Sequence, residues 1–235
     1  VATLVIGASL NKAADKLQQL TAVPDYRFDH LMGIDAVDDF IDCLHKITAQ
    51  KVPDKLERQR AQLQDAMLDT HFMLGMAHFA VAADPDLLNA FTHLLNSVGA
   101  ATVAAVSSVN APVLNRLATH QVKIGDLEDL ELMVSQNAAD ILITNSHGVE
   151  SAARLGIPLC RAGFPQYDQV GGYQKTWIGY RGTRQTLFEL ANIMLSLEKG
   201  EIHPYHSIYK QTAFNKTSGS KTINLNEVEH GADKT

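Results

Sequence analysis

Short apolar runs that alternate with helix-like stretches constrain the fold of this chain more than any other feature of its sequence. Between residues 79 and 161 the alternation is regular, and the runs predict strands over residues 79–83, 102–107, 122–124, 140–144 and 158–161. The stretches between and after them predict helices over residues 86–98, 111–118, 127–135, 149–155 and 183–197. Apolar strands separated by helices are typical of a parallel sheet that is covered on both faces. The sequence therefore predicts an α/β fold of Rossmann-like, layered parallel sheets flanked by helices.

The N-terminal part of the chain repeats this pattern in a shorter form. We expect a buried strand over residues 1–6, a turn over 7–9, a helix over 10–20 and a short strand over 26–28. Apolar residues at three- and four-residue steps predict an amphipathic helix over residues 34–44. The helix expected over residues 55–74 is mostly polar, so we interpret it as a connector rather than a core element. Because the chain opens on an apolar strand without a leading methionine, we expect it to be a fragment of a longer protein.

The composition excludes several classes of function. The 235 residues carry a formal net charge of −6 at pH 7, so no overall basic field attracts nucleic acid. No apolar run is long enough to span a membrane, and the first residues lack the features of a secretory signal. The two cysteines, Cys43 and Cys160, lie far apart, which favours a reducing compartment over a disulfide framework. We therefore expect a cytoplasmic protein that binds neither nucleic acid nor membrane.

Candidate binding residues are expected in the loops that follow the strands, because open parallel sheets bind ligands beyond the carboxyl ends of their strands. These loops cover residues 7–9, 83–86, 107–110, 125–126, 145–148 and 163–168. The loop of Asn145, Ser146, His147 and Gly148 is the most site-like, since it offers amide, hydroxyl and imidazole groups at the start of a helix. The same loop has a simpler interpretation, in which Ser146 caps the following helix.

No motif predicts a catalytic residue or a resident metal. The dinucleotide fingerprint, the Walker pattern and the Gly-x-Ser-x-Gly motif are all missing from the sequence. His203 and His206 have no third ligand nearby, and Cys160 lies in an expected core strand, where a thiol packs as a small apolar group. We therefore predict no catalytic residue and no metal ligand in this chain.

Six stretches of the sequence, in order, match a known pattern. They cover residues 28–33, 58–71, 124–130, 145–148, 157–165 and 179–183, and the most specific is Gln-Asp-Ala-Met-Leu-Asp-Thr-His at residues 64–71. The last stretch adds Tyr180 and Arg181 to the candidate binding residues. Together the stretches resemble the nitrogenase component 1 superfamily, and within it the NifN-type chains of the scaffold on which the iron–molybdenum cofactor is assembled.

The resemblance implies a domain organisation and a scaffolding role. Residues 1–52 would be the C-terminal part of a Rossmann-like middle domain, and residues 53–76 a connecting helix. Residues 77–211 would be a complete C-terminal Rossmann-like domain, followed by a flexible tail over residues 212–235. Although the family is related to the nitrogenase oxidoreductases, the chain would have no catalytic site of its own.

The resemblance also implies partners and cofactors for the full-length protein. A NifN-type chain would pair with a homologous NifE-type chain in a heterotetramer that exchanges the cofactor precursor with transient donor and acceptor proteins. That complex would hold an interface iron–sulfur cluster and a precursor cluster, and the part of the chain present in this sequence would hold neither. The catalytic relatives carry a histidine ligand near the loop that corresponds to residues 163–168, which here reads Gly-Phe-Pro-Gln-Tyr-Asp. No metal ligand is therefore transferred to any residue of this chain.

An enzyme is the alternative from another class. Residues 146–158 also resemble the nucleotide-sugar binding domain of epimerases and two-domain glycosyltransferases, in which a Gly-rich loop binds the diphosphate. The loop here has one glycine instead of a Gly-Gly pair, so the alternative depends on a short motif.

Overall fold

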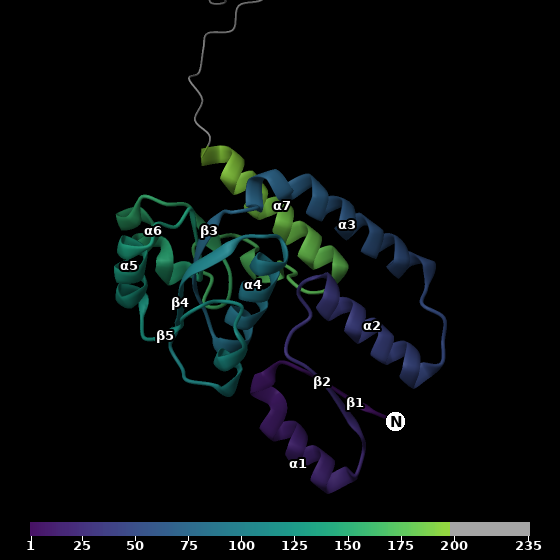
Figure 1. Ribbon diagram of the computed structural model, residues 1–235. Helices are drawn as coiled ribbons and strands as arrows, with labels where there is room; N and C mark the ends of the chain where they lie inside the picture. The colour runs from purple at the N-terminus through teal and green to yellow at the C-terminus, as the bar shows by residue number, and fades with distance from the viewer. Residues whose placement is uncertain (198–235) are drawn as a thin grey trace, which may run out of the picture. The chain divides into compact units, whose positions relative to one another are not determined.

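Five parallel strands form the main sheet of the computed structural model, which describes residues 1–197 (Figure 1). The strands are β3 (His78–Ala82), β4 (Ala101–Ser107), β5 (Lys123–Ile124), β6 (Ile141–Thr144) and β7 (Leu159–Arg161). Their order across the sheet is β5-β4-β3-β6-β7, and every neighbouring pair is parallel. The α/β class and the parallel Rossmann-like sheet that the sequence predicts are confirmed.

Some expectations from the sequence fall beyond the described part of the chain. They are the pair His203 and His206, the end of the C-terminal domain at residue 211, and the tail over residues 212–235. The division into domains after residues 52 and 76 stays a prediction.

Helices cover both faces of the main sheet. They are α3 (Asp54–Leu74), α4 (Pro85–Ser97), α5 (Leu127–Gln136), α6 (Val149–Leu155) and α7 (Gly179–Leu197). Figure 1 shows α5 and α6 on one side of the sheet and α3, α4 and α7 on the other. None of the helices within residues 1–197 is long and apolar enough to cross a membrane.

The two faces have separate apolar cores, because successive residues of a strand point to opposite faces. In β3, Phe79 and Val81 belong to the core that includes residues of α3, α4 and α7. Ala80 and Ala82 belong to the other core, which includes residues of α5 and α6. All four side chains are buried, so β3 is apolar on both sides, as its continuous apolar run predicts.

A second, two-stranded sheet lies in the N-terminal part. Its strands β1 (Thr3–Ile6) and β2 (Asp25–Phe28) are parallel, and the 3₁₀ helix η1 (Ala8–Leu10) and α1 (Asn11–Thr21) connect them. The strand predicted over residues 1–6 is shorter than expected and is mostly not buried. Only Val5 is buried, whereas Leu4 and Ile6 remain 38% and 40% exposed, because the strand has one covered face and alternate side chains point away from it.

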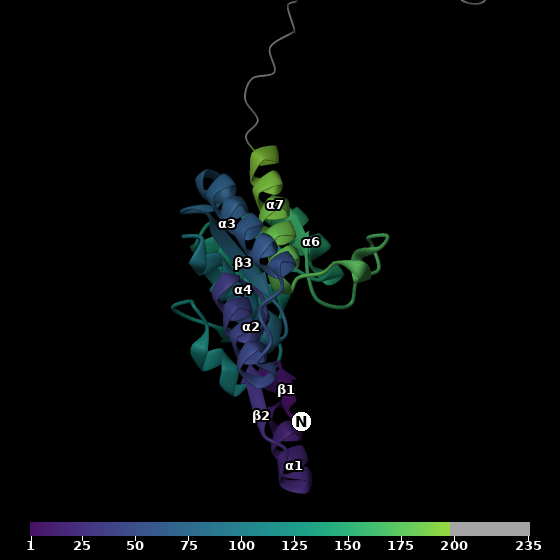
Figure 2. The ribbon, with the colours of Figure 1, turned by 90° about the vertical axis from the view of Figure 1, so that its right-hand side faces the viewer.

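The long helix α3 is a core element, so the interpretation of residues 55–74 as a mere connector was wrong. Its buried residues Leu63, Ala66, Thr70 and Leu74 recur at three- and four-residue steps along one face. Leu63 and Leu74 belong to the same core as Phe79 of β3. This face escaped the sequence pattern because two of its four members are the small residues Ala66 and Thr70. In Figures 1 and 2, α3 runs alongside α7, with which it makes extensive contacts.

One carboxylate joins three helices on this side of the sheet. Asp38 lies in α2 (Ile34–Thr48), and its Oδ1 accepts a hydrogen bond from the Tyr180 hydroxyl of α7 at 2.6 Å. The Nε of Arg60 in α3 lies 3.0 Å and 2.8 Å from Oδ1 and Oδ2 of the same carboxylate. The pKa of the Tyr180 hydroxyl is raised, mainly by burial and also by the hydrogen bond to Asp38, so the hydroxyl keeps its proton.

Two of the expected helices differ in the structure. The helix expected over residues 111–118 is the 3₁₀ helix η2 (Pro112–Arg116). It starts late because Ala111 precedes a proline and is extended, with φ −147° and ψ 149°. The last helix, expected from residue 183, already begins at Gly179, so Tyr180 and Arg181 are helical rather than part of a loop.

The burial of Leu63 gives a direct test of the role of α3. We expect Leu63→Ala to lower the free energy of unfolding by about 2–5 kcal/mol, because it removes a fully buried side chain and leaves a cavity. The matched control is Leu68→Ala on the same helix, where the side chain is 73% exposed and the change should stay within about 0.5 kcal/mol. Urea denaturation followed by circular dichroism measures both, and equal effects would contradict a core role for α3.

Candidate functional site

The main sheet has a topological switch point between β3 and β6. From β3 the chain proceeds through α4 to β4 and β5 on one side, and α5 then returns it to β6 on the other side of β3. Because the two connections diverge at the carboxyl ends of β3 and β6, a crevice opens there, and such crevices are the usual ligand sites of open α/β sheets. A hollow of about 320 Å³ occupies this position and is called the switch-point crevice below.

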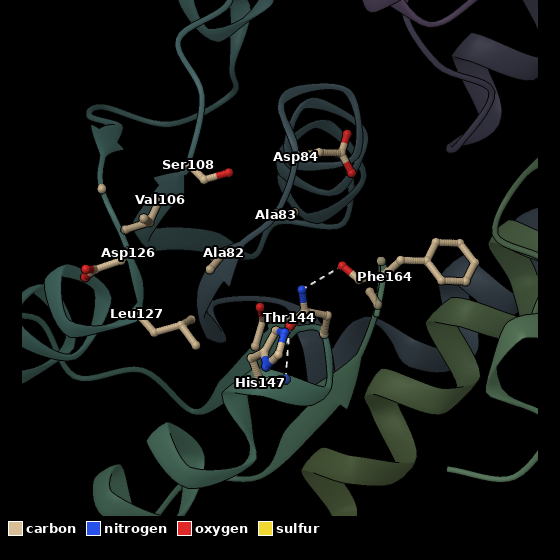
Figure 3. A pocket seen from close by; sticks show the side chains of 14 residues that line it. Ala82, Ala83, Asp84, Val106, Ser108, Asp126, Leu127, Thr144, His147 and Phe164 are labelled. Atoms are coloured by element: carbon tan, nitrogen blue, oxygen red, sulfur yellow. Dashed lines mark hydrogen bonds between the residues drawn. The ribbon is translucent and has the colours of Figure 1, made fainter. Parts of the chain in front are cut away.

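The residues that line the crevice come from the carboxyl ends of strands of the main sheet and from the segments that follow all five of them (Figure 3). Its apolar lining is mostly small and consists of Ala82, Ala83, Val106, Leu127, Ala162 and Phe164. In Figure 3, Asp126 and Leu127 stand on one side and Phe164 on the other, with Ala82 and Ala83 between them. Phe164 is 77% exposed, so it forms an open rim rather than part of the core.

Three helix starts at the crevice are capped by the chain's own side chains. Asp84 Oδ1 accepts hydrogen bonds from the backbone amides of Asp86 and Leu87, both at 3.1 Å, at the start of α4. Asp126 Oδ1 accepts from the amides of Glu128 at 2.9 Å and Asp129 at 3.2 Å at the start of α5. These amides are the groups that would otherwise bind an anion, so the caps occupy the places of a phosphate.

The third cap corrects the interpretation of the loop at residues 145–148. Asn145, not Ser146, caps the short 3₁₀ helix η3 (Ser146–Gly148), and its Oδ1 accepts from the amide of His147 at 3.0 Å. The Asn145 side-chain amide also donates to the carbonyl of Phe164 at 2.8 Å, which ties this loop to the rim of the crevice. Asparagine caps a helix as well as serine does, so the sequence alone did not distinguish the two.

Ser146 is buried and holds the neighbouring loop in place. Its hydroxyl donates to Asp168 and accepts from the amide of Tyr167 at 3.1 Å. Arg161, at the end of β7, donates from Nε to Asp168 Oδ2 at 2.8 Å. The hydrogen bond from Arg161, and to a smaller extent the one from Ser146, lowers the pKa of the Asp168 carboxyl to about 2. The loop that carries Phe164 and Tyr167 is thereby fastened to both β6 and β7.

His147 and Gly148 have different surroundings. His147 is exposed, lines the crevice, and meets the ring of Tyr167 edge to face, with a centroid separation of 5.7 Å. Gly148 is buried, and a Cβ at this position would lie 2.1 Å from Thr144 Cγ2, so only glycine fits against β6. Of the four loop residues, Asn145 and His147 line the crevice, and Ser146 and Gly148 support them.

Tyr180 and Arg181 do not lie at this crevice. Tyr180 is 5% exposed and is bound to Asp38, as described above. Arg181 is exposed and lines a separate hollow of about 460 Å³ with Arg184 and Phe188. Whether any of the six candidate residues binds a ligand stays a prediction.

The crevice residues Asp84, Asp126 and Phe164 were not among the candidates from the sequence, although each lies in one of the loops expected after the strands. The signal for the two aspartates was present, since Asp84 precedes Pro85 and Asp126 precedes an acidic first turn. That signal predicts a helix cap, and only the sheet order shows that both caps face the same crevice.

A second hollow, of about 380 Å³, shares Asp84, Gly163 and Phe164 with the crevice. It extends toward His30 and Met32 and toward Trp177. Burial, and secondly the nearby His93, lowers the pKa of His30, whose ring centroid lies 5.5 Å from that of His93. The ring of Trp177 is covered by Lys175 Nζ at 4.2 Å, and Lys175 also pairs with Glu189 of α7.

Cys160 lies in β7 and is almost completely buried. Burial, and secondly the negative charge of Glu189, raises the pKa of its thiol to about 12. Within residues 1–197 no group of three or more His, Cys, Asp or Glu side chains is arranged to hold a metal ion.

Comparison with known proteins identifies the family. The family model described as nitrogenase component 1 type oxidoreductase matches residues 1–195. The chain belongs to this family.

The relatives of this nitrogenase component 1 chain include proteins named nitrogenase iron–molybdenum cofactor biosynthesis protein NifN. The protein of this name from Bradyrhizobium diazoefficiens is 42% identical over 194 residues, which are 83% of this chain and 41% of the relative. The one from Klebsiella pneumoniae is 41% identical over 192 residues, which are 82% of this chain and 42% of the relative. The chain thus spans less than half the length of the relatives it matches.

A solved structure, nitrogenase Cp1 at pH 6.5, superimposes on 85% of this chain with a TM-score of 0.79 and 28% identity, and the match covers 47% of that structure's chain. This likeness agrees with the α/β fold described above. These comparisons do not support the alternative of a nucleotide-sugar binding domain.

The environments of the two cysteines predict different reactivity. A neutral alkylating reagent should modify Cys160 in the native protein at least about a hundred-fold more slowly than in the unfolded protein, because little thiolate forms near neutral pH. Cys43 is only half-buried and should react first. Mass spectrometry after timed labelling measures this, with Cys43→Ala as the control that leaves no fast thiol. Rapid labelling of Cys160 in that variant would contradict the buried environment.

The Arg161–Asp168 contact predicts the titration of the crevice loop. We expect the Asp168 carboxyl to titrate at about pH 2, and Arg161→Gln to return its pKa toward the usual value of about 3.9. Ser146→Ala should raise it less, because Arg161 is the larger cause. Since the pKa is lowered in the folded state, the contact stabilises the fold above about pH 4 and ceases to do so as the pH falls to about 2. Carboxyl NMR titration measures the shift, and a wild-type value near 4 would contradict the contact.

Proposed function

We propose that this protein acts as a NifN-type subunit of the scaffold on which the precursor of the nitrogenase iron–molybdenum cofactor is assembled and matured. The observation that carries the proposal is its 42% identity to a protein named for this process over 83% of the chain. The match extends through both the N-terminal strands and the main sheet, since the family model covers residues 1–195.

In this role the chain contributes a packed framework rather than ligands to a metal cluster. Its main sheet is buried on both faces, and the side chains that fasten the loop at residues 163–168 are Ser146, Arg161 and Asp168. That loop contains no histidine, and Cys160 is enclosed in β7. We therefore assign the interface iron–sulfur cluster and the precursor cluster to other parts of the full-length cytoplasmic complex.

A homologous NifE-type chain is the proposed partner, in a heterotetramer that exchanges the precursor with donor and acceptor proteins. A surface suited to such assembly lies on α3 and just after it. Leu68, Phe72 and Met76 recur every four residues and are 73%, 90% and 87% exposed. Leu68 and Phe72 lie on the side of α3 away from its buried stripe, and Met76 follows the end of the helix. Exposed apolar residues grouped in this way are typical of a subunit interface. We assign these three residues to a contact with another chain of the assembly.

Restoration of nitrogenase in a strain that lacks its own NifN tests the proposed function. The full-length protein that contains this sequence should restore acetylene reduction, because nitrogenase needs its mature cofactor. A variant with Leu68→Ser and Phe72→Ser should restore much less and should co-purify less NifE-type chain. The matched control is Leu132→Ser, which changes an exposed apolar residue of α5 and should behave as the unchanged protein. Normal assembly without any acetylene reduction would contradict the scaffold role.

Reconstitution tests the assignment of the clusters to other parts of the complex. We expect this chain, incubated anaerobically with iron and sulfide, to retain no stoichiometric iron–sulfur cluster, since its two cysteines lie on separate elements and Cys160 is buried. Iron and acid-labile sulfide analysis with visible absorption measures this. A cluster that forms in the unchanged chain and disappears in a variant with Cys43→Ala and Cys160→Ala would contradict the assignment.

A further inference from the structure

A pair of histidines joins the N-terminal elements to the main sheet. His30 follows β2 and His93 lies in α4, and their ring centroids are 5.5 Å apart with the ring planes inclined by 36°. The Nε2 of His93 lies 2.8 Å from the carbonyl oxygen of Arg116 and donates to it, since a carbonyl oxygen only accepts. His30 is half-buried and lines the second hollow. Two titratable rings therefore meet at the junction between the N-terminal elements and the sheet.

The hydrogen bond that His30 accepts requires a neutral ring. Its Nδ1 lies 3.3 Å from the backbone nitrogen of Met32, whose N–H donates to it. An imidazolium carries a hydrogen on both ring nitrogens, so it has no lone pair left to accept this bond. Met32 is 2% exposed and belongs to the same core as Phe79, so its amide would lose its partner at a place shielded from water. Protonation of His30 therefore acts on a core residue.

The other charged groups around His30 have partners of their own. Those that line the second hollow are Asp29, bound to Arg116 of η2 at 2.9 Å, Lys175, paired with Glu189 of α7, Asp86, bonded to Ser9, and Asp84, which caps α4. Tyr173 is the remaining titratable residue of the lining, and its hydroxyl accepts from the side chain of Gln174 at 3.4 Å. His30 and His93 are thus the groups at this junction that change charge near neutral pH.

The surroundings of His30 favour its neutral form. Burial, and secondly the charge of His93, lowers the pKa of His30 below the usual value of 6.5, and Asp29 opposes this to a smaller extent. Because the pKa is lowered in the folded state, the neutral ring contributes fully to stability above about pH 6.5 and contributes less as the pH falls below that value. Once both rings are charged they also repel each other.

We propose that the contact between His30 and His93 is a pH-dependent switch between the segment of residues 29–32 and α4. With both rings neutral, the segment is held against the helix. Protonation of His30 breaks its bond to Met32 and loosens the segment, which opens the second hollow. This inference concerns the junction between the N-terminal elements and the main sheet, and it holds whether or not the chain serves in cofactor assembly.

Titration of the chain from about pH 8 to about pH 5 tests the switch, because histidines titrate in this range and carboxylates stay largely ionised. Histidine NMR should give a midpoint for His30 below 6.5. Trp177, the single tryptophan of the sequence, lines the same hollow, so its emission maximum should move to longer wavelength with that midpoint. The exchange protection of the Met32 amide should fall in parallel, while the far-ultraviolet circular dichroism stays unchanged.

Two variants separate the proton from the fold. The amide oxygen of asparagine can accept from Met32 in place of Nδ1 and takes up no proton in this range, so His30→Asn should abolish the shift of the Trp177 emission. His93→Gln removes the neighbouring charge from an exposed position and should move the midpoint of His30 up toward 6.5. The matched control is His120→Asn, which removes an exposed histidine that does not line the hollow and should leave the midpoint unchanged.

Three outcomes would overturn the proposal. A shift of the Trp177 emission that persists in His30→Asn would assign the transition to another group. A midpoint for His30 at or above 6.5, or protection of the Met32 amide that is independent of pH, would show that the proton is not coupled to the segment. Loss of circular dichroism together with the emission shift would indicate unfolding of the whole chain rather than a local change.

Discussion

The central strand β3 is the constraint on which the rest of the structure depends. It is hydrogen-bonded to β4 on one edge and to β6 on the other, and its side chains Phe79 to Ala82 are buried on both faces. A strand in this position needs helices above and below, because otherwise one apolar face would meet water. Helices α3, α4 and α7 cover one face of β3, and helices α5 and α6 cover the other. The crevice lies where the connections that leave β3 and β6 run to opposite sides of the sheet.

The side chains that cap the helices at the crevice also occupy the amides at which a phosphate would bind. Asp84 and Asp126 satisfy amides that would otherwise be unpaired, which contributes about 0.5–2 kcal/mol at a typical cap. The same side chains place negative charge at the carboxyl edge of the sheet. A phosphate ligand and an acidic cap compete for the same amides, so a chain that caps its helices with aspartate gives up the usual anion site of this fold.

The N-terminal elements are held to the main sheet by apolar contacts, since Met32 and Val37 belong to the core of Phe79, and also by polar contacts. Asp38 joins α2 to Arg60 and Tyr180, and Ser9 Oγ donates to Asp86 Oδ2 at 2.5 Å at the first turn of α4. Arg116 of η2 bonds to Asp29 at 2.9 Å. The face of α3 opposite its buried stripe carries exposed Leu68 and Phe72, so this helix has one apolar face for the core and another for an outside partner. Because the apolar residues of α3 are divided between two faces of a mostly polar helix, the sequence alone did not show that one of these faces is buried.

The sequence by itself determined the class of fold, the parallel strands and most helix bounds, because continuous apolar runs, proline and capping residues act through local geometry. It also contained the family motifs and the loops in which the crevice lies. Only the tertiary structure decided that Leu63 and Leu74 of α3 are core residues, that Asn145 rather than Ser146 is the cap, and that Tyr180 is bound to Asp38 away from the crevice. It likewise placed Asp84 and Asp126, residues 42 positions apart, at one hollow. The physical reason is that burial, and the meeting of distant loops, depend on strand order, which pairs residues that no local pattern relates.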